Sequence, residues 1–202
     1  INYINSMGLR AGRRTQRRYV KGTSEVTGGF DIEVAPQGLG ILLKHAMGAV
    51  NTTGAGPYTH VFTPGDLDDK TLSIQVGRPS IDGVVRPFDY LGCSIPTWSL
   101  TAAVNDFLKA HFDVYGMEEK TDQTLTVATY PATLTPFSFV DGALTIDATA
   151  SCVKSFTFNA DNALATGRFQ ICATNPGYPK LAKEQGIRTY GGNFAADFLD
   201  LT

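Results

Sequence analysis

The histidines are the residues of this sequence most able to do chemistry, and their spacing gives none of them a partner. His45, His60 and His111 lie far apart along the chain, and no metal-ligand or catalytic companion lies near any of them. A histidine without such a companion usually has a structural or surface role. We therefore expect neither a metal site nor a catalytic site at these three positions.

Cysteines and clustered carboxylates also lack the patterns that chemistry requires. Cys93, Cys152 and Cys172 are odd in number and show no Cys-x-x-Cys spacing, so we predict three free thiols in a reducing compartment. The acidic run at residues 66–69 resembles the start of a calcium loop, but the expected glycine and closing glutamate are absent. No hydrolase, zinc-protease or nucleotide-binding motif occurs. The sequence predicts no catalytic residue, no cofactor, no metal and no enzyme.

Charge is sparse and unevenly distributed. Charged residues make up 18 % of the chain, below the roughly 25 % of ordinary soluble domains. Residues 1–21 hold six basic residues and no acid, so the remainder carries 11 basic and 19 acidic residues. This pattern indicates either nucleic-acid binding or docking onto the acidic body of an identical neighbour. The six basic residues are Arg10, Arg13, Arg14, Arg17, Arg18 and Lys21.

The hydrophobic pattern that would position any site is mainly that of β-strands. Alternation from Glu25 to Val34 predicts a half-buried strand. A Leu-rich stripe predicts one helix that begins at Pro36 and ends at Gly48. Later segments alternate again, with a predicted hairpin at Asp141-Gly142 and a last strand near residues 189–198.

We therefore expect a β-sandwich or barrel with one flanking α-helix in residues 22–202. Residues 1–21 have no hydrophobic face, so they form an extended N-terminal arm that orders only against a partner. No stretch reaches the roughly 20 apolar residues of a membrane span, so we expect no membrane partner.

The order of features along the chain resembles that of a known family. The features are the strand of residues 22–30, the Pro-started helix ending at Met47-Gly48, the strand of residues 58–63, Gly92-Cys93 leading into the Trp98 strand, residues 155–162, and residues 191–198. This order is similar to that of the tail tube (major tail) protein of long-tailed bacteriophages. The resemblance covers most of residues 22–200.

The resemblance implies a structural role. In that family a β-sandwich with a flanking helix closes into six-membered rings, and the rings stack into a tube through which the genome passes. Extended arms and a long hairpin make the ring-to-ring contacts. The implied partners are further copies of the chain in homohexameric rings, other tail proteins such as the tape measure and the terminator, and double-stranded DNA in transit. The implied location is the virion tail, and the host cytoplasm during assembly.

Two sets of candidate site residues follow. A lumen that lets a polyanion slide favours an acidic or neutral lining. Asp31, Glu33 and Asp197 alternate with apolar residues on two strands, so they face away from the core, toward either the lumen or the outer wall. The second set is the inter-subunit arm, in which Arg10, Arg13, Arg14, Arg17 and Arg18 are expected to pair with carboxylates of neighbouring subunits.

Two other functions stay open on the sequence. The basic arm is compatible with a DNA-binding protein, although DNA readers usually add a helix or ribbon that enters a groove. A ligand-binding β-sandwich, for example one that binds carbohydrate, would need a row of exposed aromatic side chains on one face. The aromatic residues here mostly occupy the apolar side of alternating strands.

Overall fold

The structure is a computed structural model, and it describes residues 2–5, 19–130, 134–146, 148–172 and 176–197. Strands account for 49 % of the described residues and helical residues for 7 %. These proportions, with one flanking α-helix among the described residues, confirm the predicted mainly β fold. Within the described ranges, no helix is long and apolar enough to span a bilayer.

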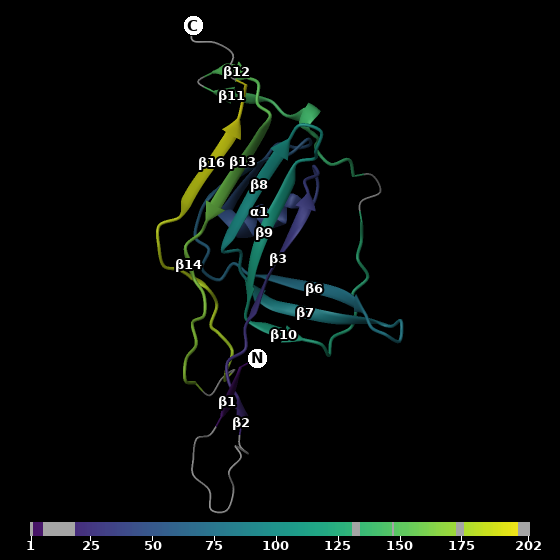
Figure 1. Ribbon diagram of the computed structural model, residues 1–202, viewed down its shortest axis with the longest axis vertical. Helices are drawn as coiled ribbons and strands as arrows, with labels where there is room; N and C mark the ends of the chain where they lie inside the picture. Colours follow the sequence, from purple (N-terminus) through teal and green to yellow (C-terminus); the bar gives the residue numbers. More distant parts are fainter. Residues whose placement is uncertain (1, 6–18, 131–133, 147, 173–175, 198–202) are drawn as a thin grey trace, which may run out of the picture.

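A five-stranded antiparallel sheet, here called the main sheet, forms the centre of the molecule (Figure 1). Its strands lie in the order β16-β13-β8-β9-β3, so a strand from each end of the chain forms an edge. The strands predicted between Glu25 and Val34 and near Thr189 are confirmed as β3 and β16. The bounds are β3 Val26–Glu33, β8 Thr97–Ala103, β9 Lys109–Gly116, β13 Ser155–Asp161 and β16 Thr189–Ala195.

One face of the main sheet packs against helix α1, Leu39–Met47, which lies behind the sheet in Figure 1. Successive side chains of a strand point to opposite faces, so every second residue reaches this core. The rings of Trp98 and Phe112 are stacked with centroids 6.4 Å apart, and the ring centroid of Phe158 lies 5.3 Å from that of Trp98. The fully packed core residues are Val34, Ala46, Ile95, Trp98, Ala110, Phe112 and Ala160.

The helix begins three residues later than the sequence pattern predicts. Residues 36–38 form a turn and Leu39 is the first helical residue, so the predicted start at Pro36 is wrong. The cause is Gly38, whose φ of 93° is left-handed and cannot continue an α-helix. The predicted end is confirmed at Gly48, where φ is 102° and an added Cβ would clash with the Gly65 carbonyl oxygen.

Residues distant in sequence hold the C-terminal end of α1. The side-chain amide of Asn162 is completely buried and donates to the carbonyl oxygens of Ala46 at 2.9 Å and Ile95 at 2.8 Å. The Arg188 guanidinium donates to the Met47 carbonyl oxygen at 3.0 Å. The last carbonyls of a helix have no partner inside the helix, and these bonds, together with the one from the Gly65 N–H to the Met47 carbonyl oxygen at 2.8 Å, supply donors for them.

A second sheet of three strands projects from one side of the main sheet (Figure 1). Ser94 and Tyr115 exchange backbone hydrogen bonds of 2.8 and 3.0 Å, which join the end of β7 to β9. The β6–β7 hairpin ends in a turn at residues 80–84, in which the Asp82 carboxylate accepts hydrogen bonds from the turn itself. The order is β10-β7-β6, with β6 Leu72–Pro79, β7 Val85–Cys93 and β10 Glu118–Lys120.

Two-stranded antiparallel pairs make up the remaining described strands. The β4–β5 pair follows α1 directly, and the β1–β2 pair lies at the N-terminal end of the molecule (Figure 1). The bounds are β1 Tyr3–Asn5, β2 Tyr19–Lys21, β4 Gly48–Thr53, β5 Thr59–Pro64, β11 Leu144–Ile146, β12 Thr149–Ser151, β14 Leu164–Ala165 and β15 Lys183–Glu184.

The hairpin predicted across Asp141-Gly142 is wrong. Residues Phe139–Asp141 form a 3-10 turn, η1, and both the backbone N–H and the hydroxyl of Ser138 donate to the Asp141 carboxylate at 2.9 Å. A side chain that bonds to nearby backbone competes with strand pairing. The chain therefore reverses after Leu144–Ile146, where β11 pairs with β12.

Candidate functional site

The face of the main sheet that points away from α1 presents rows of polar residues, and we call it the polar face. Its residues alternate with the core residues of the same strands, so they point to the opposite side. Three rows cross all five strands and contain no apolar side chain. From β16 to β3 the rows are Asn193, Thr157, Thr101, Lys109 and Glu33; Gly191, Asn159, Ser99, His111 and Asp31; and Thr189, Asp161, Thr97, Asp113 and Gly29.

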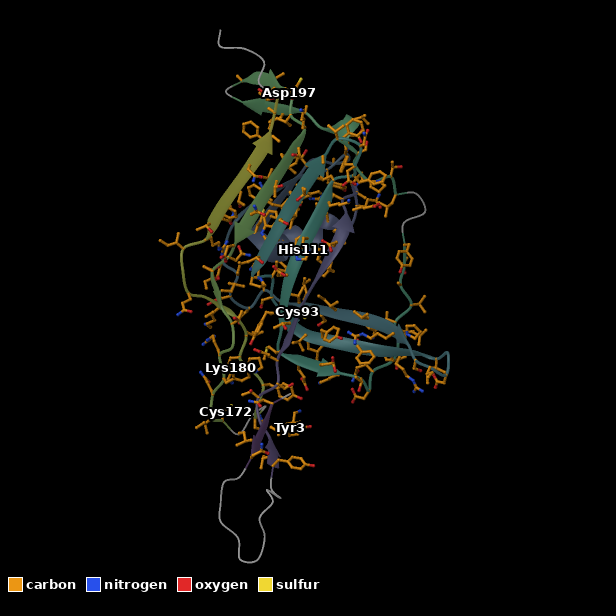
Figure 2. The ribbon with its side chains drawn as sticks, in the orientation of Figure 1. Tyr3, Cys93, His111, Cys172, Lys180 and Asp197 are labelled. Atoms are coloured by element: carbon orange, nitrogen blue, oxygen red, sulfur yellow. The ribbon has the colours of Figure 1, made fainter. Side chains whose placement is uncertain are left out.

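Figure 2 shows His111 near the middle of the main sheet. A carboxylate lies on either side of its ring. Its Nδ1 is 2.8 Å from the Asp31 carboxylate, and its Nε2 is 3.3 Å from the Asp113 carboxylate. The hydrogen bond to Asp31 raises the pKa of His111 above its ordinary value, and the bond to Asp113 acts in the same direction. The imidazolium form is therefore more favoured at this position than in a free histidine side chain.

The polar face carries more negative than positive charge. Glu33 is opposite Lys109 in the β3–β9 register. The Lys109 ammonium lies 2.7 Å from the Asp106 carboxylate, and this hydrogen bond raises the pKa of Lys109. The carboxylates of the three rows are Asp31, Glu33, Asp113 and Asp161, and the basic residues are Lys109 and His111.

A shallow hollow of about 410 Å³ lies on the polar face, and its residues do not form a catalytic site. Ser99, His111 and Asp31 are of the types found in a hydrolytic triad and stand in one row. However, both imidazole nitrogens face carboxylates, so neither is placed to accept a proton from the serine. Within the described residues, no group of three or more His, Cys, Asp or Glu side chains is placed to hold a metal ion.

The structure brings two of the three predicted lumen acids together and separates the third. Asp31 and Glu33 lie two residues apart on β3 and stand in neighbouring rows of the polar face. Asp197 follows β16 at the end of the molecule opposite the β1–β2 pair and forms an ion pair with Lys154 (Figure 2). The five predicted arm residues, Arg10, Arg13, Arg14, Arg17 and Arg18, lie outside the described residues.

The sequence did not lead us to name the polar residues of β9 and β8 as site residues. Lys109, His111 and Asp113 alternate with the core residues Ala110 and Phe112, and this alternation indicates that their side chains face away from the core. The β8 residues opposite them, Thr97, Ser99 and Thr101, carry the same signal. Alternation does not give the order of the strands in the sheet. That order decides that these residues form common rows with residues of β3 and β13.

Comparison with known proteins gives the family. A search of the curated proteins found no match. The family model described as phage tail tube protein matches residues 1–202, the whole chain. Members of this family are structural proteins of the virion tail that assemble with one another and with other tail proteins. The polar face backed by a single helix and the match over the whole chain lead to one conclusion: this chain belongs to the phage tail tube protein family.

Proposed function

We propose that the chain is a non-enzymatic building block that forms homohexameric rings, and that the rings stack into a tube through which the phage genome passes. Other tail proteins, such as a tape measure and a terminator, are the further partners in this proposal. Assembly takes place in the host cytoplasm, and the finished tube is part of the virion tail. Double-stranded DNA is in contact with the protein only during transit.

The observation that carries the proposal is the polar face. The three described rows of the polar face hold Thr, Ser, Asn and Gly with four carboxylates, and these rows contain no cluster of Lys and Arg that would bind a phosphate backbone. The other face of the same sheet packs against α1 and the core. In the proposal the polar face lines the lumen, and Asp31 and Glu33 contribute to its negative charge.

The free edges of the main sheet support ring formation. Among the described strands, β3 pairs only with β9, and β16 pairs only with β13. An unpaired edge is a template for association, and closure into a barrel removes it. Every residue of β16 is exposed, including Phe194 at 57 %. We propose that β16 of one subunit pairs with β3 of the next, so that the main sheets form one continuous barrel around the lumen.

Residues 1–21 act as an inter-subunit arm in this proposal, and residues 22–202 form the body. The arm has no acid with which its basic residues can pair internally. Arg10, Arg13, Arg14, Arg17 and Arg18 therefore bind carboxylates of neighbouring subunits. Exposed ion pairs contribute only about 0–1 kcal/mol each, but bidentate arginine pairs at a partly desolvated interface are stronger and repeat around the ring. The β6–β7 hairpin is the candidate for the second ring-to-ring contact.

The test is negative-stain microscopy and sedimentation of the purified protein at high concentration. We expect rings, and tubes where growth is initiated; rings alone count as support. A matched pair of variants locates the interface: Phe194→Asp on the β16 edge and Tyr58→Asp beside β5, whose wild-type side chains are 57 % and 64 % exposed. Phe194→Asp should remain a folded monomer, whereas Tyr58→Asp should assemble. A wild-type protein that stays a compact monomer at millimolar concentration contradicts the proposal.

A further inference from the structure

The β1–β2 hairpin exposes an apolar pair of side chains. Ile4 and Val20 are directly opposite in the register of the hairpin, so they share one face, and they are 63 % and 66 % exposed. On the other face, the rings of Tyr3 and Tyr19 meet edge to face with centroids 5.6 Å apart. A lone two-stranded hairpin is at best marginally stable in water, so a surface that covers Ile4 and Val20 would stabilise it.

An apolar hollow of about 580 Å³ opens between η1, the β11–β12 pair and the ends of β8 and β13. Phe137, Phe139 and Val104 line it and are 39 %, 43 % and 52 % exposed. Cys152, whose side chain is also exposed, stands on its wall. Exposed apolar concavities of this kind mark sites of association.

The hairpin and the hollow lie at opposite ends of the molecule. Figure 1 places β1–β2 at one end of the longest axis and β11–β12 at the other, and Figure 2 places Tyr3 and Asp197 in the same way. The hairpin of a copy therefore cannot reach the hollow of the same copy. A donor and an acceptor on opposite ends make a heterologous contact, which repeats as an open stack instead of closing into a dimer.

Net charge also favours this pairing over association of like ends. Residues 1–21 hold six basic residues and no acid, whereas residues 134–160 and 194–197 together hold three acidic residues and one lysine. Opposite charges draw the hairpin end of one copy toward the hollow end of another, and like charges oppose contact between two hairpin ends.

We propose that the β1–β2 hairpin of one copy docks into the apolar hollow of the next copy along the tube, with Ile4 and Val20 inserted between η1 and the end of β13. This inference rests on the proposed function and deepens it, because it assigns the surface that receives the hairpin. The partner is a second copy of this chain.

Disulfide trapping tests the contact, because Cys152 already lines the hollow. The protein to use is the full chain with Val20→Cys, in a Cys172→Ser background because Cys172 lies near the hairpin end (Figure 2). Oxidised glutathione is the electron acceptor. We expect a ladder of dimers, trimers and larger species on a non-reducing gel, all of which reductant converts to monomer. If instead two hairpin ends paired with each other, Val20→Cys of one copy would cross-link to Val20→Cys of another, and the products would stop at dimers.

Two matched variants serve as controls. Tyr19→Cys places the thiol on the other face of β2 and should cross-link at least five-fold less. Val20→Cys combined with Cys152→Ser should abolish the ladder. The docking is wrong if Tyr19→Cys cross-links as well as Val20→Cys, or if the ladder persists without Cys152. If a small ligand fills the hollow in place of the hairpin, no ladder forms, and the docking is wrong in that case too.

Microscopy of the same wild-type preparation separates this inference from the proposed function. Normal tubes without a ladder overturn the docking and leave the tube proposal intact. A ladder without rings or tubes supports the docking and contradicts the ring proposal. The absence of both overturns both.

Discussion

The Asp31 carboxylate lies 2.8 Å from Nδ1 of His111, although 80 positions of sequence separate the two residues. The bond joins β3 to β9 across the polar face, and the Asp113 carboxylate holds the other ring nitrogen at 3.3 Å. A protonated His111 therefore offsets part of the negative charge of this face. The charge of the proposed lumen wall consequently depends on pH around the pKa of His111.

We predict that Asp31→Asn lowers the pKa of His111. The hydrogen bond raises this pKa above its ordinary value of 6.5, so its contribution to stability is fully present below pH 6.5 and is lost as pH rises through the folded-state pKa. NMR titration of the His111 ring protons measures the change. An unchanged His111 midpoint in Asp31→Asn contradicts the prediction.

Charge reversal of the candidate lumen acids should slow genome ejection without preventing assembly. Lysines at positions 31, 33 and 197 would hold phosphates that the wild-type carboxylates of Asp31, Glu33 and Asp197 repel. The measurement is the rate of DNA release from particles that carry the variant tube. Glu119→Lys on β10 is the matched control. A tube structure with these three carboxylates on its outer wall would contradict the prediction, and so would an unchanged rate of DNA release.

Asn162→Ala should lower the free energy of unfolding by about 1–3 kcal/mol, because it leaves the buried carbonyl oxygens of Ala46 and Ile95 without their donor. Urea denaturation followed by circular dichroism measures the loss. Asn159→Ala removes the same type of side chain from an exposed position of β13, three residues earlier in the chain, and its effect should stay within about 0.5 kcal/mol. Equal losses in the two variants would mean that the buried bonds do not hold α1.

Deletion of residues 1–16 should leave a folded protein that assembles poorly. The deletion removes three of the six basic residues of the arm, and ion pairs between subunits weaken as salt rises. Light scattering across a salt series measures assembly, and circular dichroism checks the fold. If the truncated protein forms tubes of normal length and salt tolerance, the arm is not an assembly element and the DNA-binding reading gains support.

Cys93 and Cys152 should differ sharply in reactivity. Burial raises the pKa of the Cys93 thiol to about 11 and leaves only 1 % of the residue exposed, whereas Cys152 is exposed. Only the thiolate is nucleophilic, so iodoacetamide should label Cys152 in the native protein and Cys93 only after unfolding. Mass spectrometry reads out both sites and also tests the prediction that the thiols are free. Rapid native labelling of Cys93, or a Cys93–Cys152 bridge in the isolated protein, would contradict these expectations.

Local patterns in the sequence determined much of the fold. Alternation of apolar and polar residues is a property of each strand by itself, so β3 and β16 were predictable, as was the outward direction of Asp31 and Glu33. The end of the helix at Gly48 was predictable for the same reason, since a glycine after an apolar stripe is a local signal. The helix start predicted at Pro36 was wrong because the sequence shows Gly38 only as a weak helix former. It does not show that the φ of Gly38 is left-handed.

Only the tertiary structure decided which strands are neighbours, and the site depends on that choice. Strand order places β9 between β3 and β8, so His111 meets Asp31 and the polar residues form rows. It also brings Asn162 to the end of α1, where a buried amide replaces bonds that the helix cannot make. Pairing between distant strands depends on the free energy of the whole packed core, which no local window of sequence contains.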